Sequence, residues 1–354
     1  MEQHSIDFLM QLLGTPGPSG DEVAVARVWR DEAKTFADSV SADVRGNSFA
    51  LLNGQAGAPR VLLAGHIDEI GVMITHIDDE GFLWFSTIGG WDPQVLVAQR
   101  VRLLGRQGHV IGVIGKKAIH LMKSEDRERA SKIEDLWIDI GAKNRDEALA
   151  QVRVGASGVI DAPALRLPNE RIVSRSIDNR IGAFTVLEAL RLLAADRPAA
   201  TVAAVATSQE EITFAGASTA AFAFEPQVSI VVDVTHATDH PEANRRRSGH
   251  VTLGGGPALS RGSAVSAIIF DLLVAIAERE GIPFSLEASP RYTGTDADAI
   301  HSSRAGVAAG VVSIPNRYMH SPNEMIQLDD VDNAARLIAA FVKSLHVDSR
   351  FIPE

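Results

Sequence analysis

The chain has 354 residues, of which 45% are hydrophobic and 22% charged, and its formal net charge is -11. This length predicts two domains or one large domain with an insertion, and the negative charge argues against nucleic-acid binding, because phosphate contacts need concentrated Lys and Arg. The chain contains no cysteine, so disulfides, thiolate metal sites and a cysteine nucleophile are excluded, and any metal must be held by His and carboxylates.

The N-terminal residues and the apolar segments predict the cellular location. Residues 1–13 contain Glu2, His4 and Asp7 and lack the basic region followed by an apolar core that is typical of a signal peptide. No apolar stretch is long enough to span a membrane. We therefore expect a cytoplasmic protein without membrane contact, and we expect the short basic run 245–247 to be a solvated loop.

The first part of the chain predicts the start of an α/β domain. The expected elements are a turn-rich loop over 14–21, a helix over 22–36, a strand pair over 44–52 with a turn near Gly46 and Asn47, and a buried strand over 60–65. This last strand leads into His66, Asp68 and Glu69. Open α/β sheets place their sites at such carboxyl ends of strands.

The segment 72–161 has a different character and is predicted to be an inserted domain. It shows strand-like alternation, repeated glycine turns and few helical patterns, as in 111–115 and 155–160. These features favour a small β barrel. The charged stretch 122–132 has no strand pattern and is predicted to be a mobile loop.

After the insertion the chain alternates between helical and strand patterns. We expect helices over 181–194, 216–222, 267–279 and 330–345, and strands over 201–207, 228–232 and 306–314. Such alternation predicts a mostly parallel sheet flanked by helices, formed by residues 1–71 and 162–354.

Two adjacent glutamates follow the strand expected over 201–207. Glu210 and Glu211 stand where a buried strand ends, and neighbouring side chains on an extended backbone point to opposite sides. We therefore expect the two carboxylates to have different environments and different roles. The alternative is a solvated pair in a loop.

Several further polar residues share this position at the predicted ends of strands or the start of a helix. The set comprises His66, Asp68, Asp178, Glu210, Glu211, Asp233 and His320. Two histidines and three carboxylates suit two divalent ions with one bridging carboxylate, and a further carboxylate could act as a base. Two metals about 3.5–4 Å apart share a water and lower its pKa, which is hydrolysis chemistry. The sequence contains no nucleophile elbow, P-loop or dinucleotide-binding fingerprint.

The same residues carry a resemblance to a known family. The motifs are His66-Ile-Asp68-Glu69-Ile-Gly71, Ser176-Ile-Asp178-Asn179-Arg180, Gln209-Glu210-Glu211, Asp233-Val-Thr-His236 and Arg317-Tyr-Met-His320-Ser-Pro322. In this order they resemble the tetrahedral (TET) aminopeptidases, dinuclear metallopeptidases also described as glutamyl aminopeptidases or as cellulase-like proteins. The resemblance runs from about Pro18 to Leu345.

The resemblance implies a role for each residue of the set. It implies that one metal is bound by His66 and Asp233 and the other by Glu211 and His320, with Asp178 as the bridge between them. It further implies that Glu210 is the general base and that Asp68 orients His66. The implied metal is zinc or cobalt.

The resemblance also implies a fold and an assembly. The fold would be that of a dinuclear zinc peptidase, and the insertion would be a PDZ-like barrel that makes dimer contacts. Six such dimers would form a hollow dodecamer that admits only peptides.

The chain departs from the family pattern at two places. After the double glutamate it reads Ile212-Thr213-Phe214, which loses an arginine, and the stretch 293–298 carries an extra carboxylate at Asp298. Both departures bear on the substrate preference. We expect Arg261 and Asp296 to contact the substrate, and the alternative for Arg261 is a solvated loop arginine.

Together these observations predict a dinuclear metalloaminopeptidase that removes N-terminal residues from short peptides, with a water between the metals and a glutamate base. One alternative is a carbohydrate-active hydrolase, although glycosidases need two carboxylates that face each other across about 5–10 Å. The other alternative is a noncatalytic assembly protein that uses the insertion as an interface.

Overall fold

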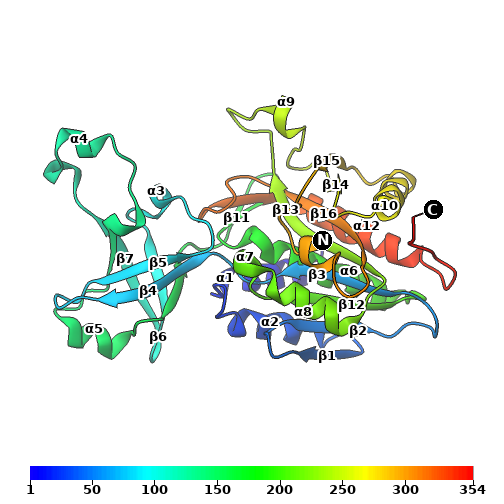
Figure 1. The fold of residues 1–354 in the computed structure, drawn as a ribbon, viewed down its shortest axis with the longest axis horizontal. Coiled ribbons are helices and arrows are strands. Elements are labelled where there is room, and N and C mark those ends of the chain that lie inside the picture. Colours follow the sequence, from blue (N-terminus) through cyan, green and yellow to red (C-terminus); the bar gives the residue numbers. More distant parts are fainter. Residues whose placement is uncertain (354) are drawn as a thin grey trace.

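The protein consists of an α/β domain and a small β barrel that projects from one side of it (Figure 1). The computed structural model describes residues 1–353, apart from the side chains of Glu125, Asp126 and Arg247. The segments 122–132 and 245–247 were expected to be loops, but each overlaps a short helix, and the part of each expectation that concerns these three side chains lies outside the described residues. Within the described residues, no helix combines the length and the apolar character needed to cross a bilayer.

The α/β domain is built on an eight-stranded sheet with the order β1-β2-β12-β3-β13-β16-β14-β15. Its strands are β1 (Ser39–Ala42), β2 (Ser48–Leu52), β3 (Arg60–His66), β12 (Thr201–Thr207), β13 (Val228–His236), β14 (Ala258–Gly262), β15 (Ser285–Ser289) and β16 (Ala308–Asn316). The central strands β12, β3, β13 and β16 run parallel to one another. Their carboxyl ends therefore lie at one edge of the sheet, and the prediction of a mostly parallel central sheet is confirmed.

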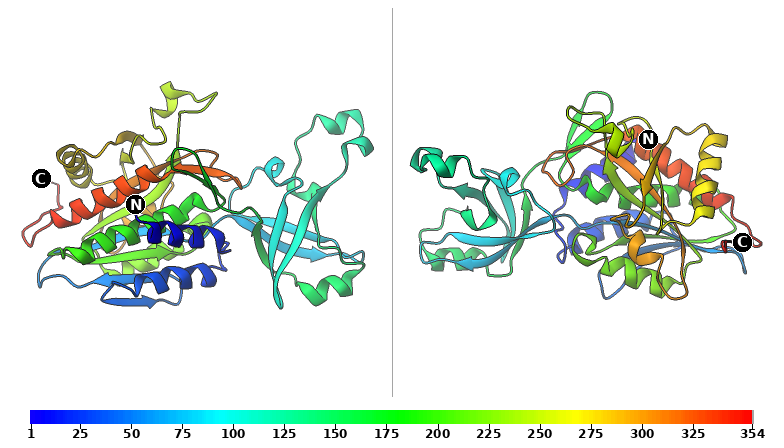
Figure 2. Two further views of the ribbon diagram at one scale, coloured as in Figure 1. Left: turned by 180° about the vertical axis from the view of Figure 1, so that it is seen from behind. Right: turned by 45° about the horizontal axis from the view of Figure 1, so that its top comes forward.

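Helices cover both faces of this sheet, as Figure 2 shows from two further directions. Along β3, Val61 and Leu63 belong to one core cluster and Leu62 and Ala64 to the other, which reflects the alternation of side chains on a strand. One face packs against α1 (Gln3–Gly14), α2 (Val23–Ala33), α6 (Ile177–Ala195), α10 (Ala267–Glu280) and α12 (Leu328–Lys343), and the other against α8 (Ala215–Phe224) and α11 (Ala297–Ile300).

The segment predicted as an insertion forms a closed barrel with the strand order β4-β5-β8-β7-β6-β9. Its elements are β4 (Gly71–Ile77), β5 (Leu83–Ile88), α3 (Pro93–Leu96), β6 (Arg100–Gly105), β7 (Gly108–Lys116), η1 (Ile119–Leu121), α4 (Ser124–Arg127), η2 (Ile133–Asp135), β8 (Leu136–Asp139), α5 (Arg145–Gln151) and β9 (Ser157–Ile160). The barrel has its own apolar core, separate from that of the α/β domain. The predicted small β barrel is thus confirmed.

The remaining elements are short. A three-stranded sheet has the order β10-β11-β17 and is formed by β10 (Leu165–Leu167), β11 (Arg171–Ser174) and β17 (Glu324–Gln327), and the short helices are α7 (Glu210–Thr213) and α9 (Arg245–Ser248). Helix α1 was not among the predicted elements, although its buried residues Ile6, Leu9 and Leu13 have helical spacing.

Candidate functional site

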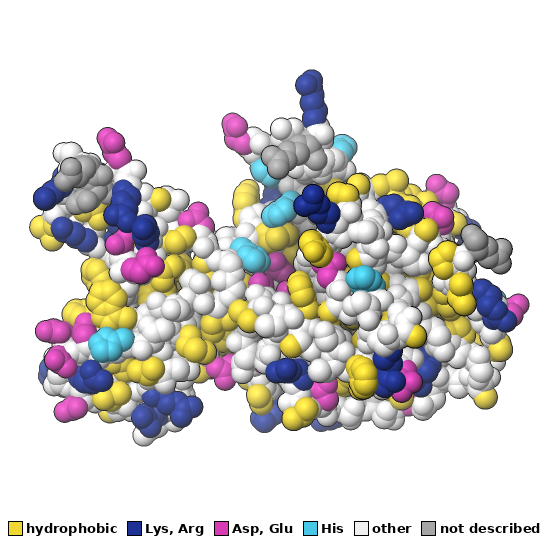
Figure 3. Space-filling model, viewed as in Figure 1, with side chains coloured by type: hydrophobic (Ala, Val, Ile, Leu, Met, Phe, Trp, Pro, Cys, Tyr) yellow, Lys and Arg dark blue, Asp and Glu magenta, His cyan; other side chains and the backbone are white. Residues whose placement is uncertain are grey.

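The site lies at the carboxyl edge of the central strands, beside the barrel. His66 ends β3, Asp233 lies near the end of β13, and Glu210 follows β12. Asp178 comes from the start of α6, and His320 follows β16. Figure 3 shows acidic and histidine side chains together at this border between the α/β domain and the barrel. Residues far apart in the sequence therefore meet because parallel strands end at the same edge.

Asp178 divides its two carboxylate oxygens between the two histidines. Its Oδ1 lies 3.2 Å from His66 Nε2, and its Oδ2 lies 3.4 Å from His320 Nε2. Asp233 Oδ1 lies 3.9 Å from the same nitrogen of His66, and Glu211 Oε2 lies 3.5 Å from that of His320. The structure thus forms two groups that share Asp178, and within each group the ligand atoms lie within 4.8 Å of one another.

Hydrogen bonds orient both imidazole rings toward Asp178. His320 Nδ1 lies 2.7 Å from the carbonyl oxygen of Gly90, and His66 Nδ1 lies 3.3 Å from that of Asp68. Because a carbonyl oxygen can only accept, each Nδ1 carries the hydrogen and donates it. In the neutral ring the lone pair is then on Nε2, which faces a carboxylate oxygen. A cation between these two acceptors, either the proton of an imidazolium or a metal ion, stabilises the arrangement, and the hydrogen bond to Asp178 raises the pKa of His320 to about 9.

The buried charge of the site supports a divalent ion in that place. Burial raises the pKa of the Glu211 carboxyl, and the negative charge of Asp178 raises it further. Burial also holds the pKa of Asp233 well above its ordinary value. Among the described side chains, none donates a hydrogen bond to the buried Oε1 of Glu211. A set of crowded carboxylates and imidazole nitrogens therefore fits two divalent cations, which would supply the missing charge and ligand bonds.

Glu210 points into the same cluster from a turn of unusual geometry. Its Oε2 lies 3.6 Å from His66 Nε2, and burial raises the pKa of its carboxyl. The preceding Gln209 has a left-handed backbone with φ 59°, and Glu210 and Glu211 begin α7. The expected extended backbone at this pair is therefore wrong. The two carboxylates diverge because they are successive residues of a helical turn, about 100° apart around its axis.

Asp68 holds this turn against the end of β3. Its Oδ1 accepts the backbone N–H of Glu210 at 3.1 Å, and its Oδ2 accepts that of Glu211 at 3.2 Å. The same carboxylate accepts a hydrogen bond from Ser19 Oγ, and its Oδ1 lies 3.5 Å from His66 Nδ1. Asp68 was expected only to orient His66. In the structure it also holds the backbone of both glutamates.

Glu324, which was not among the predicted site residues, also holds the cluster together. Its Oε2 accepts the backbone N–H of Asp178, and its Oε1 accepts that of His320, both at 2.9 Å. Glu324 is 2% exposed. In the sequence, only its position four residues after His320 could have pointed to a role in the site. The contact with Asp178 is visible only in the folded structure.

A buried ion-pair network lies below the cluster. Glu69 Oε1 lies 2.6 Å from Arg180 Nη2, and Glu69 Oε2 contacts Arg175 Nη1. Arg180 is fully buried and also donates to the carbonyl oxygens of Leu12, at 2.8 Å, and Ile67, at 3.2 Å. The network joins the end of β3 to the start of α6. It thereby fixes the relative positions of the strand that carries His66 and the helix that carries Asp178.

The barrel contributes a loop to the site. Besides the carbonyl oxygen of Gly90 on His320, the loop brings Gly89 so close that an added Cβ would lie 3.2 Å from Glu211 Oε2. The loop is anchored by Trp91, whose indole N–H donates to the carbonyl oxygen of Gly71 at 3.0 Å. The inserted domain therefore closes one side of the cluster and sets the ring orientation of His320.

The two residues expected to contact substrate have different surroundings. Asp296 is 1% exposed, and its Oδ2 accepts a hydrogen bond from Thr207 Oγ1. After burial and the charge of Asp233, its charge also raises the pKa of Glu210, so Asp296 lies near that carboxyl. Arg261 is exposed on β14, with its guanidinium carbon 6.0 Å from the centre of the Phe270 ring. Their contacts with substrate remain predictions.

The departures from the family pattern also have clear positions. Ile212 is 54% exposed on α7, and Phe214 has a left-handed backbone with φ 52°. Asp298 accepts hydrogen bonds from the backbone N–H groups of Thr293, at 3.0 Å, and Gly294, at 2.9 Å. The extra carboxylate therefore shapes its own loop.

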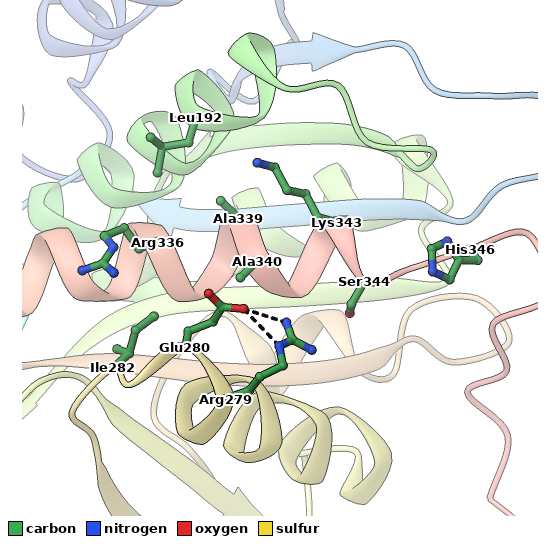
Figure 4. Close-up of a pocket in the computed structure, with 10 residues that line it drawn as sticks. All are labelled: Leu192, Arg279, Glu280, Ile282, Arg336, Ala339, Ala340, Lys343, Ser344 and His346. Carbon is green, nitrogen blue, oxygen red and sulfur yellow. Dashed lines mark hydrogen bonds and ion pairs between the residues drawn. The ribbon is translucent and has the colours of Figure 1, made fainter.

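A separate cavity of about 650 Å³ lies between α6, α10 and α12 (Figure 4). Arg279 and Glu280 pair at 3.0 Å on its wall, and Lys343 pairs with Asp196 at 2.7 Å. None of the residues that line it belongs to the His and carboxylate cluster. The chemistry of the protein is therefore assigned to the cluster.

Comparisons with known proteins agree with this geometry. Residues 46–337 match the family model described as M42 glutamyl aminopeptidase. The chain is 36% identical over 343 residues to a lysyl aminopeptidase of Pyrococcus furiosus, covering 96% of this chain and 97% of that protein.

Solved structures show the same similarity. A TET aminopeptidase from the marine sediment archaeon Thaumarchaeota archaeon SCGC AB-539-E09 has a TM-score of 0.92 and 33% identity, with 96% of each chain covered. The TET1 peptidase of Pyrococcus horikoshii, which can assemble into a tetrahedron or a large octahedral shell, has a TM-score of 0.85 and 30% identity, covering 96% of this chain and all of that one. The chain therefore belongs to the M42 glutamyl aminopeptidase family and is a peptidase.

Proposed function

We propose that this peptidase is a dinuclear metal-dependent aminopeptidase that removes N-terminal residues from short peptides. The observation that carries the proposal is the position of Asp178, whose two oxygens face two differently held histidines at 3.2 and 3.4 Å. His66 and Asp233 would hold one ion, Glu211 and His320 the other, and Asp178 would bridge them. Zinc or cobalt ions bound in this way would lower the pKa of a shared water and polarise the scissile carbonyl.

The remaining residues of the site bind, orient and move a proton. Glu210 points into the cluster beside His66, so its carboxylate is placed to take a proton from the attacking water and give it to the leaving amine. Asp68 and Glu324 hold the backbone of the ligand-bearing segments, which keeps the ligands in place.

Removal of metal tests the proposal directly. Dialysis against a chelator is expected to remove about two ions per chain and to abolish hydrolysis of a dipeptide or an aminoacyl chromogenic substrate, and addition of Zn²⁺ or Co²⁺ is expected to restore it. Metal content is measured by elemental analysis beside each assay. Full turnover in protein shown to be free of metal would refute the proposal.

We also propose that the chain assembles through its barrel into dimers and that these build a dodecamer. The barrel exposes large apolar side chains, among them Ile111 and Val113 on β7 and Leu121 in η1. Ile111 and Val113 share one face of β7, and contiguous exposed apolar side chains of this kind are typical of an interface. Light scattering of the purified protein is expected to give the mass of a dodecamer, with a smaller dimer population on dilution. A monomer mass at all concentrations would exclude this assembly.

A further inference from the structure

A half-buried ion pair beside the cluster has no role in the site described above. Arg317 Nε donates to Asp239 Oδ1 at 2.9 Å, and Arg317 Nη2 lies 2.8 Å from Asp239 Oδ2. The same Nη2 donates to the carbonyl oxygen of Asp239 at 3.0 Å. The exposed fractions of the two side chains are 14% and 16%. Because a planar guanidinium meets both carboxylate oxygens, the pair fixes the distance and the angle between the two segments that carry it.

The ion pair continues the contact between β13 and β16 beyond the ends of these strands. The last paired residues of the two strands are His236 and Asn316. Beyond them the chain from β13 enters the projecting loop that carries α9, and the chain from β16 leads to His320 (Figure 1). Asp239 lies in the first of these segments and Arg317 in the second. The pair therefore ties the strand that contributes a ligand to one metal group to the segment that contributes a ligand to the other.

Several hydrogen bonds hold the β13 side of the ion pair in place. Asp239 Oδ2 also accepts the backbone N–H of Leu253 at 3.1 Å. The buried Asp330, in the first turn of α12, accepts the backbone N–H groups of Gly254 and Gly256, both at 2.7 Å. Burial raises the pKa of Asp239, but the hydrogen bonds from the guanidinium and from Leu253 outweigh it and hold this pKa below its ordinary value. Asp239 is therefore a charged anchor that is connected to a core helix.

The segment on the other side of the ion pair has an irregular backbone. Tyr318 and His320 are left-handed, with φ 63° and 57°, a conformation that needs support from its surroundings. The side chain of His320 is 36% exposed, whereas that of His66, which belongs to β3, is 1% exposed. No regular strand holds His320, so its position depends on the side-chain and backbone contacts around it. Arg317, three residues earlier, supplies one of them.

We infer that Asp239, acting through Arg317, is a positioning residue for the metal group that contains His320. The inference rests on the proposed two-ion function and adds residues that hold one ion more tightly. A residue that orients a ligand from outside raises the affinity for the ion, because the ligand is already in place when the ion binds. The group that contains His66 takes its ligands from the regular strands β3 and β13. Loss of the ion pair therefore weakens the binding of one ion and not of the other.

Titration of the metal-free, full-length protein with Co²⁺ tests the inference, with visible absorption of the bound ion and calorimetry as readouts. Asp239→Asn keeps an oxygen that can accept from Leu253 but removes the charge that pairs with Arg317. It is expected to lower the affinity for one ion by about 10–100-fold and to leave the other within about twofold. His320→Ala identifies the affected ion, because the ion that it still binds should match the unaffected one. Hydrolysis by Asp239→Asn is expected to fall at low Co²⁺ and to recover when Co²⁺ is raised.

Two further variants make the result specific. Arg317→Lys keeps the charge but cannot meet both carboxylate oxygens, so a smaller loss of affinity for the same ion is expected. Glu188→Gln is the matched control, because Glu188 is a half-buried carboxylate that accepts from Arg191 Nε at 3.1 Å and belongs to neither metal group. It is expected to leave both affinities unchanged.

The outcomes separate this inference from the proposed function. Equal weakening of both ions, or unchanged affinities in Asp239→Asn and Arg317→Lys, would overturn the inference and leave the two-ion site intact. Circular dichroism checks the fold of each variant, and Arg317→Lys alone decides the question if Asp239→Asn does not fold. A parent protein that binds fewer than two ions would instead overturn the proposed function.

Discussion

The Glu210→Gln protein is expected to hydrolyse peptides about a hundredfold to ten-thousandfold more slowly than the parent, while it keeps about two metal ions per chain. The amide has nearly the same shape as the carboxylate but cannot take a proton from the attacking water. Glu210 contacts the cluster through His66 at 3.6 Å, whereas Asp178 and Glu211 complete the ligand groups without it. The loss should therefore appear in kcat, with little change in KM.

The measurement pairs steady-state kinetics with elemental analysis of the same sample. Glu225→Gln serves as the control, because Glu225 is exposed at the end of α8 and its contact is an ion pair with Arg304 at 3.1 Å. Activity close to that of the parent in Glu210→Gln would rule out the base assignment. Loss of one ion from this variant would make Glu210 a ligand.

The Arg180→Met protein is expected to lose about 3–5 kcal/mol of its free energy of unfolding, because removal of one partner leaves a buried charge uncompensated. Arg180 is fully buried and Glu69 is 2% exposed, so water cannot replace the lost contacts. The backbone carbonyls of Leu12 and Ile67 would also lose a donor. Guanidinium-induced unfolding of the metal-free protein measures the change, since bound metal would add its own stabilisation.

Two further variants test whether the burial of the Arg180 and Glu69 ion pair causes the loss of stability. Arg197→Met breaks an ion pair with Asp38 at 2.7 Å, but Arg197 is exposed to solvent, so a much smaller loss than in Arg180→Met is expected. The double variant Arg180→Met with Glu69→Met removes both charges and is expected to recover part of the lost stability. Equal losses in Arg180→Met and Arg197→Met would show that the buried network does not stabilise the fold as argued.

Much of the α/β domain could be predicted because local patterns dominate its central elements. The strand expected over 201–207 is β12, and the helix expected over 267–279 corresponds to α10 with a one-residue difference. Continuous apolar runs of this length fit buried parallel strands. Edge and short elements such as β10 and β15 were not predicted, because their residues are partly exposed and their pairing depends on distant segments.

The sequence by itself determined which residue types could meet in the site. His66, Glu210, Glu211 and Asp233 stand at the carboxyl ends of strands that any parallel sheet would align. The absence of cysteine restricted the ligands to imidazoles and carboxylates. Composition and spacing were sufficient for this step, because strand ends and residue chemistry are local properties of the chain.

Only the tertiary structure decided how these residues are held and what surrounds them. The hydrogen bonds from Asp178 and His320 to Glu324, and the contact of His320 with the carbonyl oxygen of Gly90, join segments that lie far apart in the sequence. The adjacent glutamates were expected on an extended backbone, but the left-handed Gln209 starts a helix there. Such contacts depend on the register of the strands and the closure of the barrel against the sheet, which no local pattern encodes.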